Sequence, residues 1–89
     1  MKKKKLIDIV KKTLQEALKR KPEELTVEEL QETLTKLREA EEIAKDMKQD
    51  LLSTIAKTQI SIYQYYLYKK MLKERRIYEL AENVYAYFP

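Results

Sequence analysis

The chain has 89 residues and a formal net charge of +4, and its length allows one domain at most. It contains no glycine, no cysteine and no histidine. The missing glycine argues against tight β-hairpins, phosphate-binding loops and dinucleotide-binding fingerprints, and the missing cysteine and histidine remove disulfides, thiol nucleophiles and structural zinc sites. The remaining composition, rich in Lys, Glu, Leu and Ala with 38% charged residues, predicts an all-α fold.

The first predicted helix covers about residues 4–20. An apolar stripe recurs every four residues along it, at Leu6, Val10, Leu14 and Leu18, with Ile7 and Ala17 beside it. Pro22 ends this helix. Because Lys2–Lys5 add positive charge to the positive end of the helix dipole, we expect residues 1–5 to form a mobile basic arm ahead of it.

The start of the second helix carries the strongest local signal in the chain. Thr26 is a suitable N-cap, and Glu29, three residues later, completes a capping box. Leu25 and Leu30 occupy the two positions of a hydrophobic staple. These residues predict a helix over about 27–49, with a single helical turn at residues 22–24 before it.

Two architectures are open for the rest of the chain, because neither proline nor glycine occurs between Val27 and Phe88. One is a helical hairpin with a single very long arm. The other has a break near residues 49–54, where Asp50 can cap a third helix over about 51–87. We favour the second, an antiparallel bundle of three helices that forms one domain over residues 1–89.

A seven-residue repeat runs through this stretch. Its first seam consists of Leu30, Leu37, Ala44, Leu51, Thr58, Tyr65 and Leu72. The companion seam consists of Leu34, Glu41, Lys48, Ile55, Ile62, Lys69 and Arg76. Charges at four positions of the companion seam argue against a simple two-stranded zipper over the whole stretch.

All seven tyrosines lie in the last third of the chain, where helical spacing gives two separate apolar sectors. One sector contains Tyr63 and Leu67, and the other contains Ile62 and Tyr65. A polar strip with Ser53, Lys57, Ser61 and Gln64 separates them. The first helix is short, and the second has a narrow apolar face. We therefore expect a second copy of the chain to cover the third helix; a tyrosine-rich monomeric core is the alternative. The predicted interface consists of Leu52, Ile55, Ala56, Ile60, Ile62, Tyr63, Tyr65, Leu67, Met71 and Leu72.

Nucleic-acid binding is the second function class. One helical stripe combines an aromatic ring with three cations, at Tyr66, Lys69, Lys73 and Arg76, which suits base stacking with phosphate contacts. The basic arm, Lys2, Lys3, Lys4 and Lys5, would add phosphate contacts. The competing use of these bases is pairing with residues 22–50, which carry a net charge of −6 between flanks of +7 and +3.

Catalysis is the least favoured class. Carboxylate pairs at helical spacing occur at Glu28/Glu32, Glu39/Glu42 and Glu42/Asp46. Helical di-metal sites combine such carboxylates with histidine, and the hydroxyls of Ser53 and Ser61 have no histidine base. We therefore expect a protein that is not an enzyme, with no cofactor, no metal and no small-molecule substrate.

No stretch is apolar enough for a membrane span, and Asp8 interrupts the only segment that could follow a signal-peptide start. We expect a soluble, cytoplasmic protein. The high Lys and Glu content without Cys or His resembles hyperthermophile composition and would suit a virus or plasmid component of such an organism. A designed bundle is the alternative, against which the uneven, tyrosine-rich last third argues.

Overall fold

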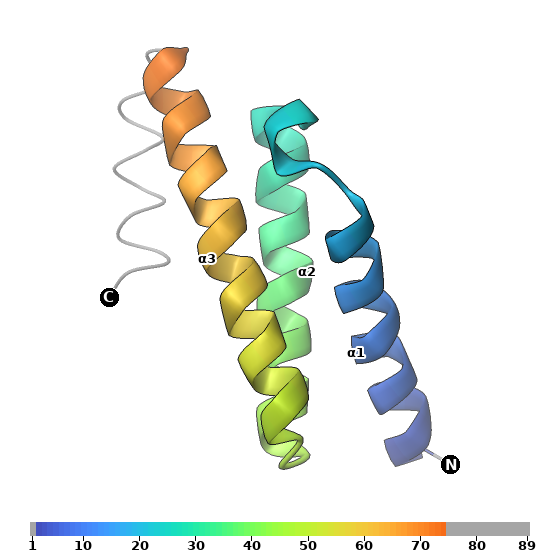
Figure 1. Cartoon of the computed structure of the whole chain (residues 1–89). Helices are drawn as coiled ribbons and strands as arrows, with labels where there is room; N and C mark the ends of the chain where they lie inside the picture. Colours follow the sequence, from blue (N-terminus) through green and yellow to red (C-terminus); the bar gives the residue numbers. More distant parts are fainter. Residues whose placement is uncertain (1, 75–89) are drawn as a thin grey trace.

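The computed structural model describes residues 2–74, with side chains from Lys4 onward. It contains three α-helices, α1 (Lys2–Lys19), α2 (Val27–Asp46) and α3 (Asp50–Lys73), and one 3₁₀ turn, η1 (Pro22–Glu24). Successive helices run in opposite directions and lie side by side (Figure 1). The described residues contain no β-strand, so the predicted all-α fold with three helices is confirmed.

The turn between α1 and α2 is built as the local sequence predicts. The backbone N–H of Glu29 donates to Oγ1 of Thr26 at 3.1 Å, and the backbone N–H of Thr26 donates to Oε1 of Glu29 at 3.0 Å. This reciprocal pair is a capping box, and it begins α2 at Val27. The single turn expected at residues 22–24 is η1, with Pro22 at its first position.

The connection between α2 and α3 takes a form that the sequence did not predict. Lys48 has a φ of 58°, in the left-handed region. It is the only described residue with a positive φ. The backbone N–H of Gln49 donates to the Ala44 carbonyl at 2.8 Å, and the N–H of Lys48 donates to the Lys45 carbonyl at 3.1 Å. These two bonds form a Schellman motif, in which a lysine occupies the position that glycine normally takes.

The structure revises the predicted bounds of all three helices. Helix α1 begins at Lys2, so the four lysines form its first turn instead of an arm, because the high helix propensity of lysine outweighs a dipole penalty of about 1 kcal/mol or less. Helix α2 ends at Asp46, and α3 begins at Asp50, with Gln49 at the N-cap position. Helix α3 ends at Lys73, and residues 75–87 of the predicted third helix lie outside the described residues.

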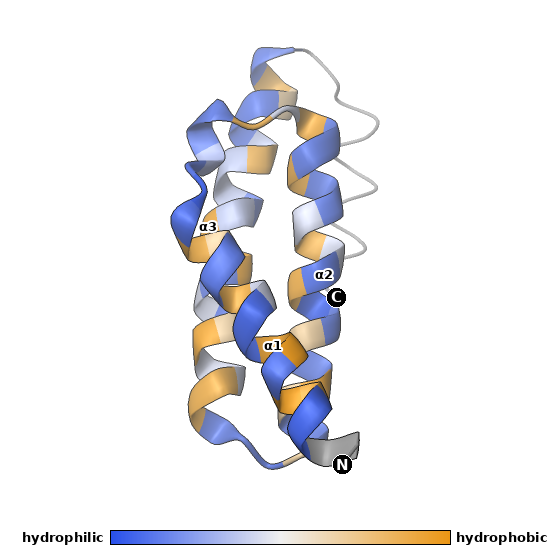
Figure 2. Cartoon of the chain, turned by 90° about the vertical axis from the view of Figure 1, so that its right-hand side faces the viewer, coloured by the Kyte–Doolittle hydropathy of each residue, from blue (hydrophilic) through white to orange (hydrophobic). Residues whose placement is uncertain are grey.

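The core lies between the three helices, and α3 packs mainly against α2. Apolar residues alternate with hydrophilic ones along each helix (Figure 2). The buried apolar side chains are Val10, Leu14 and Ala17 of α1, Val27, Leu30, Leu34, Leu37, Ala40 and Ala44 of α2, and Ala56, Tyr63, Leu67 and Met71 of α3. Leu6 and Leu18 of the predicted α1 stripe are 39% and 60% exposed. A four-residue repeat drifts around a helix of 3.6 residues per turn, so its two ends rotate out of the core.

Candidate interaction surface on helix α3

The first of the two apolar sectors of α3 is the side that packs inside the chain. Four predicted interface residues, Ala56, Tyr63, Leu67 and Met71, are fully buried against α1 and α2, and the hydroxyl of Tyr63 donates a hydrogen bond to the Ala17 carbonyl of α1. Leu52, Ile55 and Ile60 are half-buried and pack against the same core. The assignment of the four buried residues to an interface between chains is therefore wrong: they form the intramolecular core.

The second apolar sector remains on the outside of α3. Leu51 is 73% exposed, Tyr65 and Leu72 are each 59% exposed, and Ile62 is 39% exposed. The residues that continue this row at alternating steps of four and three are Ile55, Thr58 and Lys69. We call the seven residues Leu51, Ile55, Thr58, Ile62, Tyr65, Lys69 and Leu72 the α3 stripe. Its spacing is that of a coiled-coil seam.

The side chains in the middle of the α3 stripe are held by neighbouring aromatic and cationic groups. The Tyr65 and Tyr66 rings are 5.2 Å apart between centroids and meet edge to face at 83°. The Nζ atom of Lys69 lies 5.8 Å from the centroid of the Tyr65 ring. This distance is within the range of a cation–π contact, so Lys69 has a partner along the stripe itself.

Half of the polar strip between the two sectors is turned inward, since Lys57 and Ser61 are exposed. Ser53 and Gln64 are buried, and so is Gln59, although the sequence pattern favoured none of them as core residues. The reason is that both α1 and α2 contact α3, so the buried arc of α3 is wider than one apolar sector. No buried side-chain nitrogen or oxygen of the described residues lacks a hydrogen-bond partner.

A groove of about 150 Å³ lies between η1 and the C-terminal turns of α3, and we call it the basic groove. Its lining residues are Pro22, Glu23, Tyr66, Lys69, Lys70 and Lys73. The structure thus brings together three of the predicted nucleic-acid contacts, Tyr66, Lys69 and Lys73. Lys70 has a structural role, since its Nζ donates to the carbonyl oxygens of Glu23 (3.5 Å) and Leu25 and ties α3 to the turn before α2.

The N-terminal lysines are not part of this groove. They lie in the first turn of α1, at the opposite end of the bundle from the C-terminal end of α3 (Figure 1). Lys4 and Lys5 are exposed there. Arg76 lies outside the described residues. The described chain therefore does not combine the predicted basic arm and the basic stripe into one surface.

Two positive charges, Arg20 just after α1 and Lys70 of α3, act on Glu29 of the capping box. Arg20, just after α1, donates to Oγ1 of Thr33 at 3.1 Å. Hydrogen bonds from the backbone and the hydroxyl of Thr26, with smaller contributions from the positive charges of Arg20 and Lys70, lower the pKa of Glu29. This cluster agrees with the expectation that bases of the flanking segments interact with the acidic middle of the chain, whereas the ion pair between Glu32 and Lys36 (3.4 Å) lies within α2.

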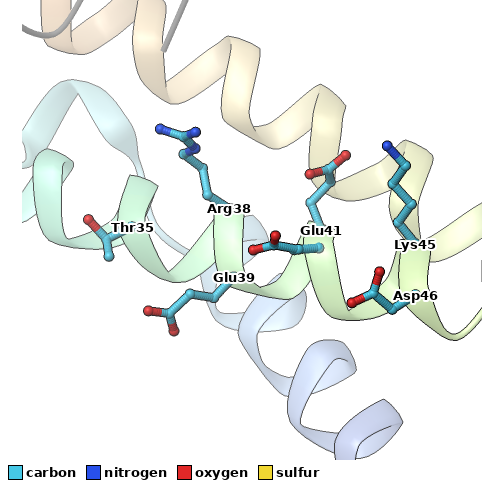
Figure 3. Close-up of a pocket in the computed structure, with 7 residues that line it drawn as sticks. Thr35, Arg38, Glu39, Glu41, Lys45 and Asp46 are labelled. Atoms are coloured by element: carbon cyan, nitrogen blue, oxygen red, sulfur yellow. The ribbon is translucent and has the colours of Figure 1, made fainter. Parts of the chain in front are cut away.

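The predicted carboxylate pairs of α2 lie on its outer face. A hollow of about 480 Å³ along this helix is lined by Thr35, Arg38, Glu39, Glu41, Glu42, Lys45 and Asp46. In Figure 3, Arg38 and Lys45 extend on one side of α2 and Glu39 on the other. Every lining residue comes from the same helix, and two cations lie among four carboxylates, so the hollow is a charged helix face.

The described part of the chain offers neither a metal-binding cluster nor a helix that could span a membrane. Its His, Cys, Asp and Glu residues form no group of three or more that could hold a metal ion. None of its helices combines the length and apolar composition that crossing a membrane requires. Comparison of the chain with protein-family models, with curated proteins and with solved structures gave no match.

Proposed function

We propose that this chain is a non-enzymatic structural or adaptor protein that acts by associating with a second copy of itself through the α3 stripe. The observation that carries the proposal is the exposure of Leu51, Ile62, Tyr65 and Leu72 in one row, on a helix whose opposite side is fully buried. Each aliphatic side chain contributes roughly 1.5–3 kcal/mol when it is fully buried. A contiguous exposed row of this kind is typical of an interaction surface.

The spacing of the row supports a helical partner. The exposed apolar residues of α1, Leu6, Ile9 and Leu18, do not repeat at regular steps of four and three. The α3 stripe keeps this alternation over seven consecutive positions. Regular alternation over three heptads is what a second helix requires in order to pack its side chains into the first.

The proposed interface is narrower than the one predicted from the sequence. It keeps Ile55, Ile62, Tyr65 and Leu72 and adds three stripe residues, Leu51, Thr58 and Lys69. Charged substitutions at the buried residues Tyr63 and Leu67 would unfold the chain and would not report on association.

Sedimentation equilibrium tests self-association directly. The unmodified chain should be a dimer at micromolar concentration, and Ile62→Lys should make it a folded monomer, because each dimer would hold two unpaired ammonium groups in its seam. Thr35→Lys adds the same charge to an exposed position of α2 and should leave the dimer intact. Circular dichroism would confirm that both variants keep their helices. If the unmodified chain is a folded monomer at every concentration from about 1 to about 100 µM, the proposal is contradicted.

A second candidate function, binding of single-stranded nucleic acid, is supported by the meeting of Tyr66, Lys69 and Lys73 in the basic groove. Fluorescence anisotropy with labelled oligo-dT at about 50 mM salt is the suitable test. Lys73→Glu should weaken binding and lower the slope of log affinity against log salt by about one or more, whereas Ile62→Lys should not. Absence of binding by the unmodified chain would remove this candidate without affecting the first.

A further inference from the structure

We infer that two copies of the chain pair their α3 helices antiparallel, in a register that places Lys69 of each copy opposite Thr58 of the other. This inference rests on the proposed self-association and specifies its geometry. It follows from the order of residues along the α3 stripe, which contains one charged residue, one small polar residue and five apolar residues.

A parallel pairing in register is the less favourable arrangement. Each stripe residue would face its own copy, so the two Lys69 ammonium groups would meet across the seam. The two charges would lie within one layer, where their repulsion is only weakly screened by water and salt. Thr58 would also face Thr58, which leaves that layer with little apolar area.

An antiparallel pairing solves both problems in one register. When Ile62 faces Tyr65, the neighbouring layers pair Ile55 with Leu72 and Thr58 with Lys69, and each pair occurs twice about the twofold axis. The large apolar residues thus face apolar residues, and the two polar residues face each other. Leu51 lies beyond the last layer.

The two lysines are then well separated. Positions 58 and 69 are eleven residues apart, which is about 16 Å along a helix and longer than the screening length of about 10 Å at 0.1 M salt. Lys69 can keep its ammonium group at the edge of the seam while its aliphatic stem covers Thr58 of the other copy. Its position over the Tyr65 ring, at 5.8 Å, already places the charge along the stripe.

Neighbouring antiparallel registers fit less well. A shift of one heptad in one direction places Lys69 opposite Leu51 and Thr58 opposite Ile62, so both polar residues face apolar ones. A shift in the other direction leaves fewer paired layers, with Lys69 opposite Tyr65. The register centred between Ile62 and Tyr65 is therefore the one in which the stripe is complementary to itself.

Disulfide exchange tests the register, because the chain has no cysteine of its own. The variants Thr58→Cys and Lys69→Cys, both at exposed positions, are mixed in equal amounts in a glutathione redox buffer, and the disulfide-linked dimers are counted by mass spectrometry. Antiparallel pairing predicts that the mixed disulfide exceeds the half share that random pairing gives. The control is a mixture of Lys57→Cys with Lys69→Cys. Lys57 is exposed but lies off the α3 stripe, so this mixture gives the share of mixed disulfide that random collisions produce.

The outcomes separate this inference from the proposed function. Homodisulfides of Thr58→Cys as the main product, or a dimer by sedimentation in which the mixed disulfide stays at the baseline, would overturn the antiparallel register and leave self-association standing. A monomer by sedimentation would overturn the proposed function and this inference together.

A charge substitution gives a second measurement that does not need a covalent bond. Thr58→Glu places a carboxylate opposite Lys69 in the antiparallel register and should tighten the dimer by about three- to fivefold through two exposed ion pairs. In a parallel dimer the same substitution brings two carboxylates together and weakens the dimer. Weaker association of Thr58→Glu by sedimentation would therefore contradict the inference.

Discussion

The hydroxyl of Tyr63 in α3 donates a buried 2.7 Å hydrogen bond to the carbonyl oxygen of Ala17 in α1. Ala17 lies in the last turn of α1, which ends at Lys19, so its carbonyl has no partner within the helix. Tyr63 therefore closes the C-terminal end of α1 from another helix. This bond makes the tyrosine part of the folded core and explains why the polar tip of so large a side chain is fully buried.

Tyr63→Phe should destabilise the chain by about 1–3 kcal/mol, because the substitution keeps the ring but leaves a buried carbonyl without a donor. The matched control is Tyr65→Phe, which removes a hydroxyl from an exposed ring of the same helix and should change the free energy of unfolding by less than about 0.5 kcal/mol. Urea unfolding at neutral pH measures both. Equal stability of the two variants would show that the bond contributes nothing.

The same tyrosine should make the fold sensitive to alkaline pH. Burial raises the pKa of Tyr63 above its usual value of 10, an effect that the Arg20 charge only partly offsets. Above pH 10 the unfolded chain loses the phenol proton while the folded chain keeps it, so the contribution of Tyr63 is complete below pH 10 and is lost as the pH rises beyond it. The difference in stability between the unmodified chain and Tyr63→Phe should therefore shrink above pH 10.

Thr26→Ala should lower the free energy of unfolding by about 1 kcal/mol, since the backbone N–H of Glu29 then loses the hydroxyl that caps α2. Thr35→Ala is the control, because this threonine lies on the exposed face of the same helix and caps nothing. Thermal unfolding of the two variants makes the comparison. A loss for Thr35→Ala as large as that for Thr26→Ala would mean that the capping box does not stabilise the start of α2.

The capping box also has an expected pH dependence. The pKa of Glu29 is lowered by the Thr26 hydrogen bonds first and by Arg20 and Lys70 after them, so its carboxylate stabilises the fold above its ordinary pKa of 4.5. This stabilisation is lost as the pH falls below 4.5, where the carboxylate becomes protonated first in the unfolded chain and then in the folded chain. Glu29→Gln and the unmodified chain should therefore converge in stability below pH 4.5.

The features that the sequence predicted correctly all have local causes. The capping box depends on Thr26 and Glu29, which are three residues apart, and η1 depends on Pro22. The number of helices followed from the periodicity of apolar residues and from the break expected near Asp50. Each of these can be recognised within a few residues, without knowledge of what packs against the helix.

Local sequence could not show which of the two apolar sectors of α3 faces the core and which stays exposed. Tyr63 and Tyr65 are two residues apart, yet Tyr63 is fully buried and Tyr65 is 59% exposed. Periodicity shows that a helix has two apolar sectors, but the position of α1 and α2 decides which sector becomes the core. The burial of Gln64 has the same origin, because two helices contact a wider arc of α3 than one apolar sector provides.

Lys48→Gly should stabilise the chain by about 0.5–1 kcal/mol. Lys48 adopts a left-handed conformation that costs a residue with a Cβ atom about 1–2 kcal/mol, and glycine removes this cost, although its freedom in the unfolded chain offsets part of the gain. Lys45→Gly, at an exposed position in the last turn of α2, should instead destabilise the chain by about 0.5–1 kcal/mol. A chain without glycine carries no sequence signal for a left-handed turn at this position. Comparing the free energies of unfolding of the two variants in urea therefore also tests whether the helix breaks at Lys48. A loss of stability in both would contradict it.

Leu67→Ala and Ile62→Ala should separate folding from association, since the two residues lie on opposite sides of α3. Leu67 is fully buried, so its truncation should cost about 2–5 kcal/mol at every protein concentration. Ile62 lies in the middle of the α3 stripe, and its truncation should weaken the dimer while changing the monomer little. Dimerisation raises the melting temperature in proportion to the logarithm of protein concentration. The slope of melting temperature against log concentration should therefore be shallower for Ile62→Ala and unchanged for Leu67→Ala. If the melting temperature of the unmodified chain is independent of concentration, the α3 stripe does not join two copies.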